Sequence, residues 1–111
     1  MEMTVHLHPD VFEIVKQGQK DIEARVNDLK RRKLQVGDTL IFLKRPLEEE
    51  HIVKTVKDLQ YYDSFEELVQ HYEMRRIYLD GYTKEQYLQE MARFYTEEAV
   101  REYGVVAILF E

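Results

Sequence analysis

Apolar residues alternate with polar ones at the start of the chain and then change to a helical spacing. Between Met3 and His8 every second residue is apolar, which is typical of a strand with one buried face. Pro9 suits the first turn of a helix, and Gly18 suits its end in the left-handed conformation. The pattern therefore predicts a strand and then a short helix, whose buried stripe is Val11, Phe12 and Val15.

The middle of the chain predicts three strands. The first begins near Asp21 and turns Ile22 and Ala24 into the core. After the Gly37-Asp38 turn signal, a buried strand is expected over 39–43 and another over 52–59.

Helical patterns follow, and an apolar segment closes the chain. Ser64 begins a capping-box pattern ahead of a helix over 65–73, and Thr83 and Thr96 each begin a further helix. The segment 74–81 is expected to be irregular or a loose extra turn. Residues 105–110 are apolar on both faces, which is typical of a central strand.

This order of elements predicts a single domain over residues 1–111 in the α+β class. A small, partly open β-barrel of about five to six strands, with helices covering one end, satisfies the order without a long exposed sheet edge.

Composition narrows the classes of function. The chain has no cysteine, no apolar run long enough for a membrane span and no basic-then-apolar signal pattern, so we expect a cytoplasmic protein that does not enter a membrane. The net charge of −6 argues against nonspecific nucleic-acid binding. Residues 1–45 nevertheless carry nine Lys and Arg against seven Asp and Glu. No phosphate loop or catalytic motif of the common hydrolases is present, and no cofactor is predicted.

Three charged side chains of both signs lie within six residues after the first predicted helix. They are Lys20, Glu23 and Arg25, in the segment that begins at Gly18. A strand beginning near Asp21 places Glu23 and Arg25 on one face, where they are close enough to pair. Such a row is either a surface ion-pair ladder of little energetic value or the wall of a polar pocket.

The segment reads G-x-K-x-x-E-x-R, and it resembles the signature of the ASCH family, a branch of the PUA-like β-barrels. The resemblance continues through the Gly37-Asp38 turn, the helix start at Ser64 and the terminal strand, so it spans nearly the whole chain. It implies a PUA-like barrel with a cleft around Lys20, Glu23 and Arg25. By analogy it also implies a binding module for RNA or a modified nucleoside.

One branch of the family that this chain resembles works as an amidohydrolase on N4-acetylcytidine. Its motif Lys is catalytic, with a Thr three residues later and a Glu before the last long helix. Lys20 matches the Lys, Glu23 stands in the place of the Thr, and Asp80 is the candidate for the second carboxylate. The alternatives are therefore a binding module, an amidohydrolase for an N4-acylated cytidine-type nucleoside, and a regulatory domain for a small anionic metabolite.

Other residues suggest contacts around the cleft. The basic run of Lys30, Arg31, Arg32 and Lys33 is either a solvated loop or an edge that contacts phosphates beside the pocket. Among the aromatic residues, Tyr61, Tyr62 and Tyr95 are candidates for stacking a base, although most aromatic residues are expected in the core. His6 and His8 share a strand face, but outward polar positions explain them, and no metal site is predicted.

Overall fold

The computed structural model describes all 111 residues and contains five strands, five α-helices and one short 3-10 helix. The strands are β1 (Glu2–Leu7), β2 (Ile22–Val26), β3 (Thr39–Lys44), β4 (His51–Tyr62) and β5 (Val105–Phe110). The helices are α1 (Pro9–Lys16), η1 (Arg31–Lys33), α2 (Phe65–Leu68), α3 (Met74–Ile77), α4 (Lys84–Phe94) and α5 (Glu97–Tyr103).

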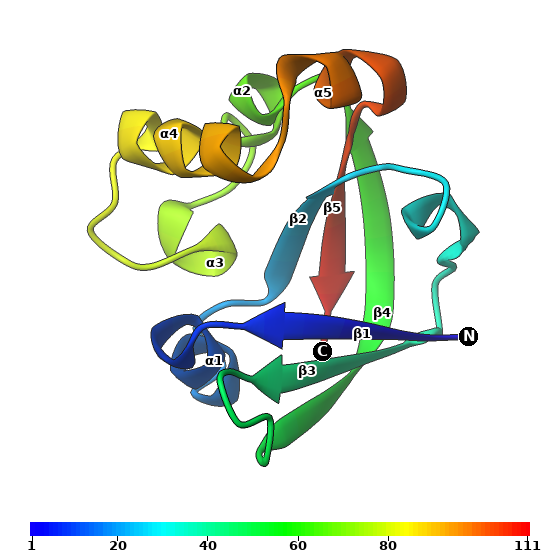
Figure 1. Ribbon diagram of the computed structural model, residues 1–111, viewed down its shortest axis with the longest axis vertical. Coiled ribbons are helices and arrows are strands. Elements are labelled where there is room, and N and C mark those ends of the chain that lie inside the picture. The colour runs from blue at the N-terminus through cyan, green and yellow to red at the C-terminus, as the bar shows by residue number, and fades with distance from the viewer.

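The strands form one mixed sheet in the order β1-β3-β4-β5-β2, which curves into a half-barrel. The β1–β3 pair is parallel and the other three pairs are antiparallel. The sheet therefore has two edges, β1 and β2, that come early in the chain. In Figure 1, α1 lies beside β1 and β3, whereas α2, α4 and α5 gather near β2 and the start of β5.

The long strand β4 joins the two halves of this sheet. Its first half pairs with β3 and its second half pairs with β5. The register shifts between Val56 and Asp58, where an extra residue forms a bulge. A bulge bends a strand and increases its twist, so it accounts for the change of direction that makes the sheet a half-barrel.

Strand β5 is buried on both faces, as its sequence predicts. Val106, Ile108 and Phe110 belong to the core inside the half-barrel, which also contains the buried stripes of β1 and α1. Val105 and Ala107 face the opposite side and pack in a second core with side chains from α2, α3 and α4. The predicted inward residues of β1 and α1 are confirmed: Met3, Val5, Leu7, Val11, Phe12 and Val15 are all buried.

The helices begin where their caps predict, but one prediction of length is wrong. Ser64, Thr83 and Thr96 each accept a hydrogen bond from a backbone N–H in the first turn of their helix. The helix expected over 65–73 ends at Leu68, and turns follow it. The Tyr72 hydroxyl lies 2.8 Å from that of Tyr62 on β4, a tertiary contact that is made from the turn rather than from a continued helix.

The segment 74–81 contains one helical turn, α3, as expected of a loose extra turn. No helix in the structure combines the length and the apolar character that crossing a membrane requires.

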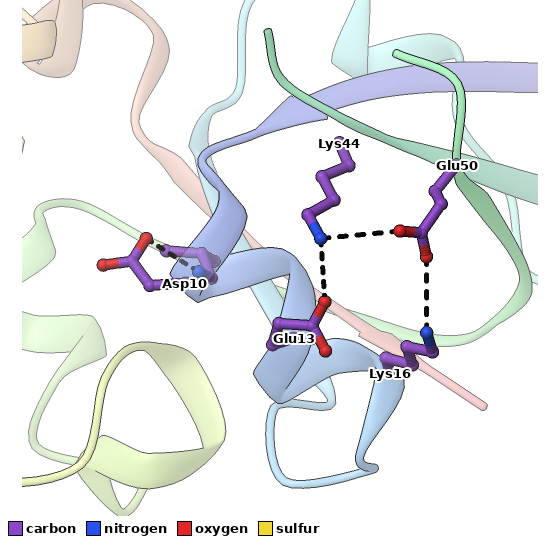
Figure 2. A network of polar contacts seen from close by, with 6 residues as sticks. Asp10, Glu13, Lys16, Lys44 and Glu50 are labelled. Atoms are coloured by element: carbon purple, nitrogen blue, oxygen red, sulfur yellow. Dashed lines mark hydrogen bonds and ion pairs between the residues drawn. The ribbon is translucent and has the colours of Figure 1, made fainter. Parts of the chain in front are cut away.

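A partly exposed network of charges connects α1 with the β3–β4 connection (Figure 2). Lys44 Nζ lies 3.0 Å from Glu13 Oε1 and 3.5 Å from Glu50 Oε1, and Lys16 Nζ lies 3.3 Å from Glu50 Oε2. In the same view, the Asp10 carboxylate accepts a hydrogen bond from the backbone in the first turn of α1. Exposed ion pairs of this kind contribute little to stability.

Candidate functional site

Strand β2 turns two charged side chains toward the interior of the half-barrel. Glu23 lies opposite Ile108 and Arg25 opposite Val106, and these two β5 residues belong to the core inside the half-barrel. Residues directly opposite each other on paired strands share a face, so Glu23 and Arg25 point to the same side. The charged row is therefore part of an interior wall, and the surface-ladder alternative does not describe it.

Lys20 reaches the same place from the turn before β2. Gly18, which has a φ of 83°, reverses the chain after α1, and Lys20 follows it. The Lys20 ammonium donates to the carbonyl of Ile22, to the carbonyl of Ile77 (2.8 Å) and to Glu23 Oε1 (3.1 Å). All three N–H groups of the ammonium are thereby used, and Lys20 links β2 to the last residue of α3.

Glu23 is held between two cations. Its Oε2 accepts from Arg25 Nε and lies 2.7 Å from an Arg25 terminal nitrogen, while its Oε1 faces Lys20. Burial by itself would raise the pKa of Glu23, but the charges of Lys20 and Arg25 outweigh it and lower that pKa to about 2. Glu23 is therefore a stable carboxylate that orients its neighbours.

Burial disfavours the charge of both cations, but the pKa of Lys20 falls and the pKa of Arg25 rises. Desolvation lowers the pKa of Lys20, and the Glu23 carboxylate opposes this shift. Burial also disfavours the charge of Arg25, but Glu23 and the Tyr95 phenol raise the Arg25 pKa above its usual value. Arg25 keeps 22% of its side-chain surface exposed, compared with 2% for Lys20, so it is the cation of this cluster that a ligand can reach.

A cavity of about 400 Å³ adjoins this cluster. That volume lies within the usual range of small-ligand pockets. The cavity lies between the two sheet edges and is bounded on one side by helices. Its lining residues from β1 to β3 are His6, Leu7, His8, Val11, Lys20, Glu23, Ala24, Arg25 and Arg45, and those from α3 to the end of α4 are Ile77, Tyr78, Tyr87, Met91, Phe94 and Tyr95.

Aromatic side chains form the helical wall of the cavity. Tyr95 stacks on Phe65, with 5.5 Å between ring centroids, and Tyr78 packs edge-on against Tyr87 at 5.8 Å. Tyr87 is buried, whereas Phe94 is 59% exposed at the rim. Rings held in this way are suitable for stacking against a planar ligand.

The edge of β2 that faces away from β5 meets the cavity at Ala24. The hydrogen bond from the N–H of Phe110 to the carbonyl of Asp21 (3.0 Å) fixes the alternation of the β2–β5 ladder. In an antiparallel ladder every second residue exchanges backbone hydrogen bonds with the partner strand. Asp21 is such a residue, so Glu23 and Arg25 also bond to β5, whereas Ala24 between them does not. The N–H and C=O of Ala24 therefore point toward the open edge and offer a ligand one donor beside one acceptor.

Three predicted residues, Asp80, Tyr61 and Tyr62, lie outside this cavity, and Tyr62 lines a separate depression together with Tyr61. Asp80 is exposed and accepts a hydrogen bond from the N–H of Gly81 (3.0 Å), within the turn before α4. Tyr61 is 59% exposed on β4. Tyr95, the third tyrosine predicted to stack a base, does line the cavity.

The basic run follows the opposite end of β2 from Lys20 and does not line the cavity. Arg31 lies 3.7 Å from Asp28, and Arg32 donates to the carbonyls of Asn27 (2.9 Å) and Tyr103 (3.3 Å). Arg32 thereby holds the β2–β3 connection against the end of α5, and Arg31 is paired within the connection itself. The lysines on either side of them, Lys30 and Lys33, are exposed.

Sequence reasoning missed most of the cavity wall. Tyr78 lies in a segment without a clear pattern, and Arg45 follows β3 with no motif around it. His6, Leu7 and His8 line the cavity because β1 is one of the sheet edges, which local periodicity does not reveal. His6 Nδ1 lies 2.6 Å from Glu48 Oε1, and no group of three or more His, Asp or Glu side chains is arranged to hold a metal ion.

Comparison with known proteins identifies relatives of this architecture. The sequence model of the ASCH domain matches residues 5–111. The crystal structure of hypothetical protein PH0355 superposes with a TM-score of 0.87 at 32% identity, covering 100% of this chain and 98% of that one. The solution structure of protein PF0455 from Pyrococcus furiosus superposes with a TM-score of 0.77 at 32% identity, covering 100% and 96%.

A third solved structure has a low sequence identity to this chain, so the match shows a similar fold alone. The crystal structure of an ASCH protein from Zymomonas mobilis superposes with a TM-score of 0.61 at 17% identity, covering 99% of this chain and 66% of that one. No curated protein sequence matches this chain significantly.

Proposed function

The chain belongs to the ASCH domain family, and we propose that it binds a nucleoside, either free or within RNA, in the cavity beside Lys20, Glu23 and Arg25. The observation that carries this proposal is that one small cavity is lined both by a buried ion cluster and by aromatic side chains. A structural ion pair alone does not need such a cavity, and an apolar ligand does not need the charges.

Each wall of the cavity has a role in this proposal. Arg25 presents a planar set of donors to a base carbonyl, and Glu23 fixes the orientation of that guanidinium from behind. The unpaired N–H and C=O of Ala24 match the neighbouring acceptor and donor on the hydrogen-bonding edge of a base. Tyr95, stacked on Phe65, provides a ring for the face of the base.

The test is a titration of the protein with the four common ribonucleosides and with N4-acetylcytidine, in which calorimetry or NMR measures binding. The decisive variant is Arg25→Lys, which keeps the charge that Glu23 requires but loses the planar fork. We expect binding at least tenfold weaker than in the wild type, with a melting temperature close to the wild-type value. The matched control is Arg75→Lys, since Arg75 on α3 is exposed and lies outside the cavity.

Two results would count against the proposal. One is the absence of binding by any of these nucleosides to the folded wild-type protein. The other is equal binding by the Arg25→Lys and Arg75→Lys variants. Titration with small dicarboxylates in parallel tests the alternative that the cavity takes an anionic metabolite.

An amidohydrolase for N4-acylated cytidine is a second candidate, because Lys20 and Glu23 lie side by side in the wall of the same cavity. In that reaction water adds to the acyl carbon, and cytidine and a carboxylate are released. Two features weigh against it: the Lys20 ammonium has no free N–H, and Glu23 is a weak base with a pKa of about 2. Incubation with N4-acetylcytidine, followed by chromatography for cytidine, decides the question, with Glu23→Gln as the inactive control.

A further inference from the structure

Arg45 is a cation at the rim of the cavity that the fold leaves unpaired. Its backbone N–H donates to the carbonyl of Leu7 (2.9 Å), which fixes the chain beside the end of β1. Its side chain is exposed and lines the cavity, and its guanidinium takes part in none of the ion pairs of the structure. By contrast, Arg25, Arg75 and Arg76 are each paired with a carboxylate.

The cavity as a whole is positive although the chain is acidic. Its lining contains three basic side chains, Lys20, Arg25 and Arg45, but one carboxylate, Glu23. Glu23 already faces both Lys20 and Arg25, so no negative charge remains to balance Arg45. In a chain of net charge −6, a local excess of positive charge concentrated in a cavity attracts an anionic ligand.

We propose that the ligand is a nucleoside phosphate and that Arg45 binds its phosphate at the rim. This inference rests on the proposed function, which places the base deeper in the cavity against Ala24 and Arg25. An Arg guanidinium matches the geometry of phosphate oxygens with two parallel N–H groups. His8, which is exposed and lines the same rim, provides a second polar group beside Arg45.

Two sources present the same phosphate chemistry. One is a free mononucleotide, which carries a phosphate monoester. The other is an RNA strand, in which a phosphodiester adjoins the bound base. In either case the phosphate lies at the rim, so that a strand continues into solvent while one base enters the cavity.

The test compares each ribonucleoside with its 5′- and 3′-monophosphates and with a short single-stranded RNA of the same base, using calorimetry at constant ionic strength. The variant is Arg45→Gln, and the matched control is Arg93→Gln, which removes one positive charge from an exposed site outside the cavity. In the wild type and in Arg93→Gln we expect the phosphate to increase affinity about tenfold, as a charge-assisted hydrogen bond does. In Arg45→Gln we expect that increase to disappear while nucleoside affinity stays the same.

The outcomes separate this inference from the proposed function. If nucleosides bind but phosphates add nothing, the phosphate site is wrong and the base site stands. If the increase persists in Arg45→Gln, another group binds the phosphate and the assignment to Arg45 is wrong. If nothing binds, both proposals fail. An increase for RNA but for neither monophosphate supports the site and identifies the phosphodiester as its source.

Discussion

Lys20 Nζ lies 3.1 Å from Glu23 Oε1, and both side chains are almost completely buried. The same ammonium also holds the backbone of β2 and the end of α3 through the carbonyls of Ile22 and Ile77. The motif residues therefore support the fold as well as the cavity. This dual role makes Lys20 a poor choice for testing function alone, because its loss affects stability directly.

Replacement of Lys20 by Met is expected to lower the free energy of unfolding by about 3 kcal/mol. Removal of one partner from a buried ion pair leaves the other charge incompletely compensated, which is strongly destabilising. The measurement is urea denaturation followed by circular dichroism. The control is Lys16→Met: Lys16 is exposed and pairs with Glu50 at the surface, so its loss should cost less than about 1 kcal/mol. Equal losses in the two variants would contradict the structural role of Lys20.

Stability should fall steeply in acid because of Glu23. Its pKa is about 2 in the folded protein and near the ordinary value of 4.5 when unfolded. A carboxyl group with a lowered folded pKa stabilises the protein above the unfolded pKa, and this contribution is lost as the pH falls from about 4.5 toward 2. At neutral pH the contribution is roughly 3 kcal/mol, from about 1.4 kcal/mol for each pH unit between the two values.

The measurement for this prediction is the free energy of unfolding between pH 2 and pH 6, in the wild type and in Glu23→Gln. Other acidic groups titrate in both proteins, so the difference between the two curves isolates Glu23. We expect that difference to be largest above pH 4.5 and to shrink toward pH 2. Parallel curves would show that Glu23 keeps an ordinary pKa in the folded protein.

The basic run is expected to affect RNA binding but not nucleoside binding. Lys30 and Lys33 are exposed beyond the far end of β2, outside the cavity. If they contact phosphates, the double variant Lys30→Gln, Lys33→Gln should bind RNA more weakly, with a salt dependence smaller by about one or two phosphate contacts. Its affinity for a nucleoside should equal that of the wild type. An unchanged salt dependence would identify the run as a solvated connection.

Gly104 should be the most sensitive of the glycines to replacement by Ala. It ends α5 with a φ of 69° and leads directly into β5, and an added Cβ would lie 3.0 Å from the carbonyl oxygen of Tyr62. Gly81, with a φ of 90°, has no atom within 4 Å of an added Cβ. We expect Gly81→Ala to cost about 1 kcal/mol for the left-handed backbone alone, and Gly104→Ala to cost clearly more, as measured by thermal denaturation. A reversed order would mean that β4 yields at Tyr62 without cost.

The sequence by itself determined the local structure of this protein. Alternation fixed the buried face of β1, helical spacing fixed the stripe of α1, and apolar residues on both faces identified β5 as an inner strand. The capping residues Thr83 and Thr96 located two helix starts. The motif spacing also placed Glu23 and Arg25 on one face of β2. These features depend on neighbouring residues, whose periodicity a sequence shows directly.

Only the tertiary structure decided which residues share the cavity. The sheet order brings the edges β1 and β2 to the same space, so His8 and Ala24 line one cavity although no local pattern connects them. The same packing turned Asp80 and Tyr61 away from it and placed the basic run at the other end of β2. Strand order depends on pairing between segments far apart in the chain, and local periodicity carries no information about that pairing. The open backbone edge at Ala24 and the unpaired cation Arg45 are consequences of this arrangement.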